Sequence, residues 1–182
     1  MSGPRAWQRW TAPPAIILSM AAPAFATQYL SVEAAQRIAF PSATQFVAAH
    51  VVYRPADVAA IEKLSGQKVR TRGEQVWKAL ADDRLLGFFV VDYVIGKHLV
   101  IDYAVALDPD GRVQRVEILE YRESYGGEIA NRAWLAQFVG KTLGDTLEVD
   151  RDIRNISGAT LSSHHVTEGV KRVLAIHAAC LR

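Results

Sequence analysis

The chain has 182 residues, a length that suits one domain with short extensions. Half of the residues are hydrophobic and 22% are charged, so the chain can bury a core, which argues against wholesale disorder. The formal net charge of +2 and the lack of a basic stripe argue against a nucleic-acid partner. The single cysteine, Cys180, excludes an internal disulfide framework and any metal site built from several cysteines.

The first 26 residues have the pattern of a secretory signal peptide. Arg5 and Arg9 precede an apolar segment over residues 12–26, which ends in the small-x-small sequence Ala-Phe-Ala. The alternative is a membrane anchor, but this segment is shorter than the span of about 20 residues that a bilayer requires, and it contains three prolines. We therefore expect cleavage after Ala26 and a soluble, near-neutral domain in the periplasm or another extracytoplasmic compartment.

Helical periodicity appears on both sides of the middle of the chain. Residues 31–40 and 56–64 carry apolar side chains at helical spacing, whereas residues 71–81 fit a helix or a strand equally well. A short helix is predicted over residues 133–139. Residues 162–181 place their apolar side chains on one face, which predicts an amphipathic C-terminal helix.

The middle of the chain has the pattern of consecutive strands. Residues 85–94 are rich in Phe, Val and Tyr, residues 98–107 alternate apolar with polar, and residues 113–121 follow a strong Asp-Pro-Asp-Gly turn signal. Three strands with short turns predict an antiparallel meander. The fold class is therefore predicted to be α+β, an antiparallel sheet with helices packed on one face.

A segment of small residues, 156–163, leads into the C-terminal helix with the sequence Ile-Ser-Gly-Ala-Thr-Leu-Ser-Ser. Free N–H groups at a helix N-terminus attract an anion such as phosphate, and Gly158 permits a positive φ. Arg151 and Arg154 lie just upstream and could pair with phosphate oxygens. The plain alternative is an ordinary helix cap, for which serine and threonine are preferred.

The same segment resembles the flavin-attachment motif of the FMN-binding domain family, in which Ser-Gly-Ala-Thr is followed by one residue and then Thr/Ser-Ser. The matching residues are Ser157, Gly158, Ala159, Thr160, Leu161, Ser162 and Ser163. The family includes the covalent-flavin subunits of ion-pumping NADH:quinone and ferredoxin-dependent oxidoreductases, and many small exported proteins. Further likeness lies in residues 96–105 and 121–129, so the resemblance covers about residues 85–174.

The resemblance implies a redox carrier rather than a stand-alone enzyme. Thr160 would carry FMN as a phosphoester, attached from FAD by a separate flavin transferase, with the rest of the motif, Glu123 and Arg154 around the cofactor. The carrier would pass electrons between membrane-bound and extracytoplasmic partners. Residues 85–182 would form the FMN-binding domain, and residues 27–84 an N-terminal helical extension.

One position departs from the family pattern. The family usually has an Asp six residues before the modified Thr, where this chain has Arg154, and the nearest acid is Asp152. The alternative is therefore a module that binds FMN or another phosphorylated ligand without a covalent bond, or an assembly subunit without redox turnover of its own.

Other candidates keep two interpretations each. The family has an acid at the position of Glu123, which implies positioning of the loop or a hydrogen bond to flavin, whereas a surface ion pair is the plain alternative. Trp134 and Tyr125 could stack on the flavin ring or belong to the core. Lys141 could meet a phosphate or remain solvated. A hydrolase triad is rejected, because the neighbouring Ser163 and His164 have diverging side chains and no Gly-x-Ser-x-Gly elbow is present.

Overall fold

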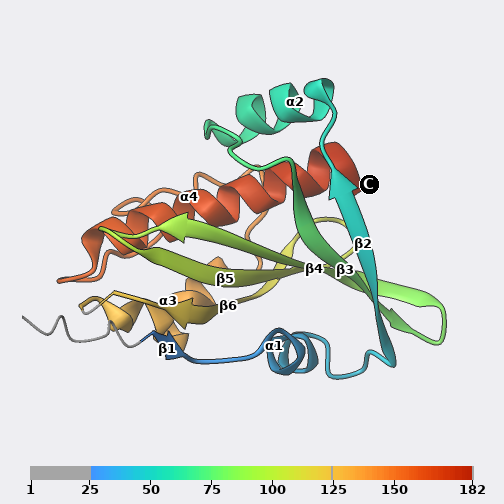
Figure 1. The fold of residues 1–182 in the computed structure, drawn as a ribbon, viewed down its shortest axis with the longest axis horizontal. Coiled ribbons are helices and arrows are strands. Elements are labelled where there is room, and N and C mark those ends of the chain that lie inside the picture. Colours follow the sequence, from blue (N-terminus) through green and yellow to red (C-terminus); the bar gives the residue numbers. More distant parts are fainter. Residues whose placement is uncertain (1–25, 124, 182) are drawn as a thin grey trace, which may run out of the picture.

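One antiparallel sheet with helices on both sides is built from residues 26–123 and 125–181, which the computed structural model describes (Figure 1). The predicted signal peptide, apart from Ala26, lies outside these described residues. The α+β fold class predicted from the sequence is confirmed.

The sheet has six strands in the order β1-β6-β5-β4-β3-β2, and every neighbouring pair is antiparallel. The predicted meander corresponds to its central strands and is confirmed. The strands are β1 (Thr27–Gln28), β2 (Gln45–Val52), β3 (Gly73–Ala81), β4 (Arg84–Ile95), β5 (Val100–Leu107) and β6 (Val113–Tyr121).

The N-terminal region differs from the helical extension that the sequence predicted. The helices α1 (Val32–Ala39) and α2 (Pro55–Ser65) lie where helices were expected, but β2 and β3 extend the same sheet. Most side chains of β2 are exposed or half-buried, so its sequence shows no clean alternation. Its hydrogen bonds depend on pairing with β3, which the local sequence does not reveal.

One face of the sheet packs against α4 (Thr160–Ile176), which continues into a π-helical turn, η3 (His177–Leu181). Val90 and Val105 from the strands share a buried cluster with Val166 and Val170 of the helix. The short helices η1 (Gly127–Ala130), α3 (Arg132–Leu135) and η2 (Ala136–Phe138) add Ile129, Trp134 and Phe138 to this core.

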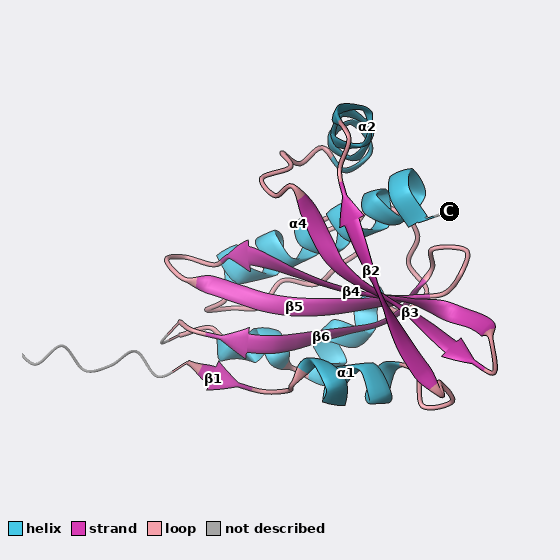
Figure 2. Cartoon of the chain, turned by 45° about the vertical axis from the view of Figure 1, so that its right-hand side comes forward, coloured by secondary structure: helices cyan, strands magenta, loops and turns pink. Residues whose placement is uncertain are grey.

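The opposite face is covered by α1, so the prediction of helices on one face is wrong (Figure 2). Ala35 and Phe40 form a second cluster with Phe89 and Ala104 of the sheet. The physical reason lies in β4, where the consecutive residues Phe88, Phe89 and Val90 are all buried. Because consecutive strand residues point to opposite faces of a sheet, both faces of β4 must be covered. The helix α2 packs on the far end of α4, where Ile61 meets Ile176.

Candidate functional site

A cavity of about 680 Å³ opens where three segments meet: the β4–β5 connection, the segment after β6, and the start of α4. Its volume lies within the range of pockets that hold small molecules and cofactors, about 300–1,000 Å³. The lining residues are Lys97, His98, Leu99, Tyr121, Glu123, Tyr125, Gly158, Ala159, Thr160, Leu161 and Ser162. Most of the predicted motif therefore shares one cavity with Glu123, although they are far apart in sequence.

The start of α4 leaves its backbone donors available. The helix begins at Thr160, two residues before the predicted start, and no side chain caps it. Gly158 has a φ of 87°, a left-handed conformation that favours glycine, although the space around it is open. Thr160 is exposed, and its hydroxyl makes no hydrogen bond with any described residue. Uncapped N–H groups and the helix dipole favour an anion at this end.

The two serines after Thr160 have different surroundings. Ser162 is buried and faces the hydroxyl of Tyr121 across the cavity wall. Ser163 is fully buried outside the lining, and its hydroxyl donates to the carbonyl of Ala159 at 3.0 Å. The structure therefore gives Ser163 a role in bracing the first helical turn, while Leu161 lies half-exposed at the cavity.

Glu123 holds the β4–β5 connection in place. Its Oε1 accepts hydrogen bonds from the backbone N–H groups of His98 at 2.6 Å and Leu99 at 3.0 Å. Partial burial alone would raise the pKa of Glu123, but the backbone donors of Leu99, His98 and Lys97 lower it below the ordinary value. Of the interpretations open in the sequence, loop positioning agrees with these contacts, and the described residues give Glu123 no ion pair.

The contact between Glu123 and the β4–β5 connection requires a glycine at residue 96. A Cβ at this residue would lie 2.7 Å from Oε1 of Glu123 and 3.1 Å from the Ile101 side chain. Any larger residue would therefore push the carboxylate away from its backbone donors. The wall of the cavity depends on this close approach between two segments about 25 residues apart in sequence.

Tyr121 forms the floor of the cavity, a role that the sequence analysis missed. Its hydroxyl donates to the carbonyl of Tyr125, and burial raises its pKa. Gly126 passes directly over it with a φ of 91°, and a Cβ there would lie 2.6 Å from the Tyr121 hydroxyl. The strand pattern placed Tyr121 in β6 and the family resemblance includes it, but neither marked it as a residue of the cavity. Tyr125 is exposed in the lining, which leaves its ring accessible to a ligand.

Arg154 and Ser157 line a neighbouring cavity of about 420 Å³ instead. The backbone of Arg154 is fixed at both ends: its N–H donates to Gln137 Oε1 at 2.9 Å, and its carbonyl accepts from Trp134 Nε1 at 2.6 Å. Its side chain is exposed and has no hydrogen bond or ion pair among the described residues. Trp134 is buried against Phe138, so of its two interpretations the structure shows the core position.

Asp152 does not substitute for the missing acid. Its carboxylate accepts from Lys141 Nζ at 2.8 Å and from the backbone N–H groups of Leu147 and Glu148. Burial opposes ionisation, but the Glu148 N–H, the Lys141 ammonium and the Leu147 N–H outweigh it and lower the pKa of Asp152 to about 2. Lys141 is held by this ion pair, and it lines neither of the two cavities beside the motif.

Within residues 26–123 and 125–181, no helix is both long and apolar enough to cross a bilayer. The same part of the chain holds no group of three or more His, Cys, Asp or Glu side chains placed to bind a metal ion.

Comparison with known proteins agrees with the predicted resemblance. Residues 96–175 match the FMN-binding domain family, which confirms the resemblance over that segment. The crystal structure of NqrC from Shewanella oneidensis superimposes with a TM-score of 0.53 at 17% identity, over 80% of this chain and 88% of that one. At this identity the likeness shows a shared fold. No curated protein matches the sequence.

Proposed function

Starting from the FMN-binding domain at residues 96–175, we propose that the protein is an exported electron-transfer flavoprotein with FMN attached through its phosphate to Thr160. The observation that carries the proposal is the exposed, unbonded hydroxyl of Thr160 at the edge of a cavity about 680 Å³ in volume. When bound, FMN supplies the redox chemistry through its isoalloxazine ring, and the chain supplies attachment and orientation.

The residues of the cavity fit the parts of this cofactor. The uncapped N-terminus of α4 offers backbone donors to a phosphate, and Lys97 and His98 add basic side chains on the opposite wall. Leu99, Leu161 and Tyr125 offer apolar and aromatic surface to a flat ring. Glu123 acts by holding the wall that carries Lys97 and His98, so it is a positioning residue in this proposal.

Attachment would be a transfer reaction that needs a second protein. The Thr160 oxygen would form the ester bond to the phosphorus of the FMN half of FAD, the bond to AMP would break, and AMP would leave with the hydroxyl proton. No hydrogen bond among the described residues joins the Thr160 hydroxyl to a side-chain base, so a flavin transferase would supply the base. Covalent attachment suits an exported carrier, because a free cofactor would diffuse away outside the cytoplasm.

The proposed electron partners are membrane-bound or extracytoplasmic proteins. The predicted signal peptide supports export, and the exposed position of Leu161 and Tyr125 leaves the cavity open to a partner. The chain shows no Gly-rich strand–helix unit for a nicotinamide cofactor, so electrons would come from another protein.

A second candidate function rests on Arg154. Its exposed guanidinium stands where the family pattern has a carboxylate, and Asp152 is already paired with Lys141. If the transferase requires that carboxylate, the same cavity would bind FMN or another phosphorylated ligand without a covalent bond. In that case the domain would act as a binding module.

The test is the intact mass of the protein expressed with a flavin transferase in an exporting host and measured under denaturing conditions. We expect a mass increase of FMN less one water, abolished in Thr160→Ala and retained in Thr44→Ala, which removes a threonine hydroxyl from an exposed residue outside the motif and the cavity. An unmodified mass with flavin released on denaturation would favour the non-covalent binder. A protein without flavin in both fractions would overturn the flavoprotein proposal.

A further inference from the structure

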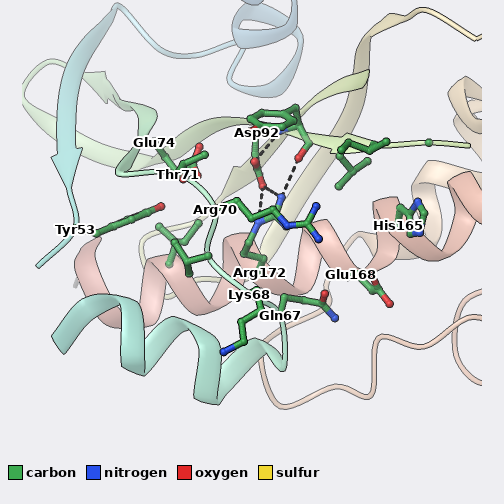
Figure 3. A pocket seen from close by; sticks show the side chains of 16 residues that line it. Tyr53, Gln67, Lys68, Arg70, Thr71, Glu74, Asp92, His165, Glu168 and Arg172 are labelled. Atoms are coloured by element: carbon green, nitrogen blue, oxygen red, sulfur yellow. Dashed lines mark hydrogen bonds and ion pairs between the residues drawn. The ribbon is translucent and has the colours of Figure 1, made fainter. Parts of the chain in front are cut away.

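A second cavity of about 300 Å³ lies between the start of β3, the end of β4 and α4, on the side covered by α2 (Figure 3). It shares no lining residue with the cavity at Thr160. Tyr53, Thr71 and Glu74 gather on one side of it, and His165 and Glu168 lie on the other. Nothing in the proposed flavin chemistry uses these side chains.

The floor of this cavity is an ion pair between Asp92 and Arg172, whose charged groups are hydrogen-bonded to each other and to neighbouring residues. Asp92 is almost fully buried, and its Oδ2 accepts from Arg172 Nη2 at 2.6 Å, from Arg172 Nε at 3.1 Å and from the Tyr103 hydroxyl at 2.6 Å. Arg172 Nη2 also donates to the carbonyl of Tyr93 at 2.9 Å. The single guanidinium on the floor is therefore committed to one carboxylate.

Glu74 is a second carboxylate without a cation of its own. Among the residues that the structure describes, one side chain donates a hydrogen bond to it: the Thr71 hydroxyl, 2.8 Å from Oε1. Desolvation and the nearby charge of Asp92 raise the pKa of Glu74 to about 7. The titratable and charged groups around Glu74 are Tyr53 after β2, Asp92 on β4, Tyr103 on β5 and Arg172 on α4, with Lys68, Arg70, His165 and Glu168 lining the rest of the cavity.

Tyr53 adds an unsatisfied polar atom to the same corner. Its buried hydroxyl lies near Glu74 but outside hydrogen-bond geometry, and it has no other partner among the described residues. We propose that this cavity binds a small organic cation with N–H donors, such as a primary ammonium, with Glu74 as its counter-ion and Tyr53 as a hydrogen-bond partner. The aliphatic side chains of Val69, Val94 and Ile176 would contact a short alkyl chain.

The balance of buried charge favours a cation over an anion. Ionised Glu74, which is half-buried, and the buried Asp92 face one guanidinium, so these three side chains together lack one positive charge. Two basic residues of the rim do not pair with these carboxylates: Lys68 pairs with Glu62 at 3.1 Å, and the exposed Arg70 makes no ion pair with Glu74 or Asp92 among the described residues. An alkylammonium would complete the charge balance and donate to both Glu74 and Tyr53.

The test is titration of the full protein with n-butylammonium chloride at constant ionic strength, followed by calorimetry and by amide chemical shifts. We expect shifts around the cavity, with binding at least tenfold weaker for n-butanol, butyrate and tetramethylammonium, which lack the charge, reverse it or lack N–H donors. Binding should weaken about tenfold per pH unit below about pH 7, because a proton on Glu74 competes with the cation.

Variants separate the counter-ion from the rest of the cavity. Glu74→Gln should weaken butylammonium binding at least tenfold at about pH 8 and abolish the pH dependence, and Tyr53→Phe should weaken it severalfold. Glu148→Gln makes the same substitution at an exposed residue outside this cavity and should stay within about twofold. The pH series of the unmodified protein tests the proposal even if a variant folds poorly.

Three outcomes would overturn the proposal: no saturable binding of butylammonium, tighter binding of butyrate, or unchanged affinity in Glu74→Gln. The flavin proposal is unaffected by any of them, because flavin content is measured by mass and absorbance on the same samples. The titration can be repeated on Thr160→Ala, where the result should not change.

Discussion

Two glutamates, Glu123 and Glu74, show how differently this fold treats a carboxylate. Glu123 lies at the cavity edge and accepts hydrogen bonds from consecutive backbone N–H groups, which lower its pKa. Glu74 is more deeply buried beside Asp92 and has a single side-chain donor, and its pKa rises to about 7. Both side chains belong to walls of cavities, but only one of them has its charge satisfied.

The difference separates two ways of building a site. At Glu123 the backbone N–H groups of the β4–β5 connection satisfy the carboxylate, which therefore has a structural role. The group that this cavity offers to a ligand is instead the uncapped N-terminus of α4. At Glu74 the fold leaves a charge uncompensated, which costs stability unless a proton or a ligand neutralises it. Stability measurements can therefore distinguish the two carboxylates without any ligand.

The largest effect is expected at Arg172, the cation that neutralises Asp92. Arg172→Met leaves a nearly fully buried carboxylate with only the Tyr103 hydroxyl and the Tyr93 N–H as donors. We expect a loss of about 3–5 kcal/mol in the free energy of unfolding, measured by urea denaturation at about pH 7. The double variant Asp92→Asn, Arg172→Met should recover much of this loss, and equal stability of the two variants would contradict the pairing argument.

The next effect is the pH dependence that Glu74 imposes. Its folded-state pKa of about 7 lies above the ordinary 4.5, so between these values the folded protein holds a proton that the unfolded chain has released. The free energy of unfolding should therefore fall as the pH rises from about 4.5 to about 7, by about 2–3 kcal/mol, and then level off.

Glu74→Gln provides the matched measurement. The variant cannot ionise, so its stability should lack this decline and should exceed that of the unmodified protein at about pH 8. Thermal or urea unfolding across the pH range gives both curves. An identical decline in the variant would assign the effect to another group.

A smaller effect of opposite sign is expected at Glu123. Its pKa is lowered, so its contribution is present above the unfolded value and is lost as the pH falls through the folded value. Glu123→Gln should cost about 0.5–1 kcal/mol near neutral pH, a figure reduced by solvent screening, and nothing at strongly acidic pH.

The functional consequence of Glu123→Gln should exceed its effect on stability. Its amide accepts the His98 and Leu99 N–H groups less strongly than a carboxylate, which loosens the wall opposite Thr160. We therefore expect lower flavin retention in the Thr160→Ala background, measured by absorbance after gel filtration. Unchanged retention would show that the wall does not need this contact.

Local patterns predicted the parts of this molecule that neighbouring residues determine. The turn signal and alternation located β4 to β6, and the small-residue segment located the start of α4. Strand β2 was missed because its exposed side chains carry little pattern and its partner is a distant segment. The second face of helices was missed because consecutive buried residues in β4 were not interpreted as two buried faces.

The cavities show the same limit. The Ser-Gly-Ala-Thr segment is continuous in sequence, so the residues from Gly158 to Ser162 that line the first cavity could be proposed from the chain alone. Tyr121 and Leu99 enter that cavity only through the tertiary fold. The second cavity joins Tyr53, Glu74 and Arg172 from three separate segments, and no spacing in the sequence indicates that they meet.

Arg154 carries the smallest expected effect on stability and the sharpest question about function. Its backbone is fixed by Gln137 and Trp134, while its side chain is exposed and has no partner among the described residues, so Arg154→Asp should change the free energy of unfolding by less than about 0.5 kcal/mol.

If the transferase needs a carboxylate at this position, Arg154→Asp should accelerate flavin attachment to Thr160 at least tenfold in a time course of intact mass. Arg154→Asn introduces a side chain of nearly the same shape as Asp but without its negative charge, so its attachment rate should match that of the unmodified protein. Equal, measurable rates in all three proteins would show that the charge at residue 154 does not control attachment, and the non-covalent alternative would lose the observation on which it rests.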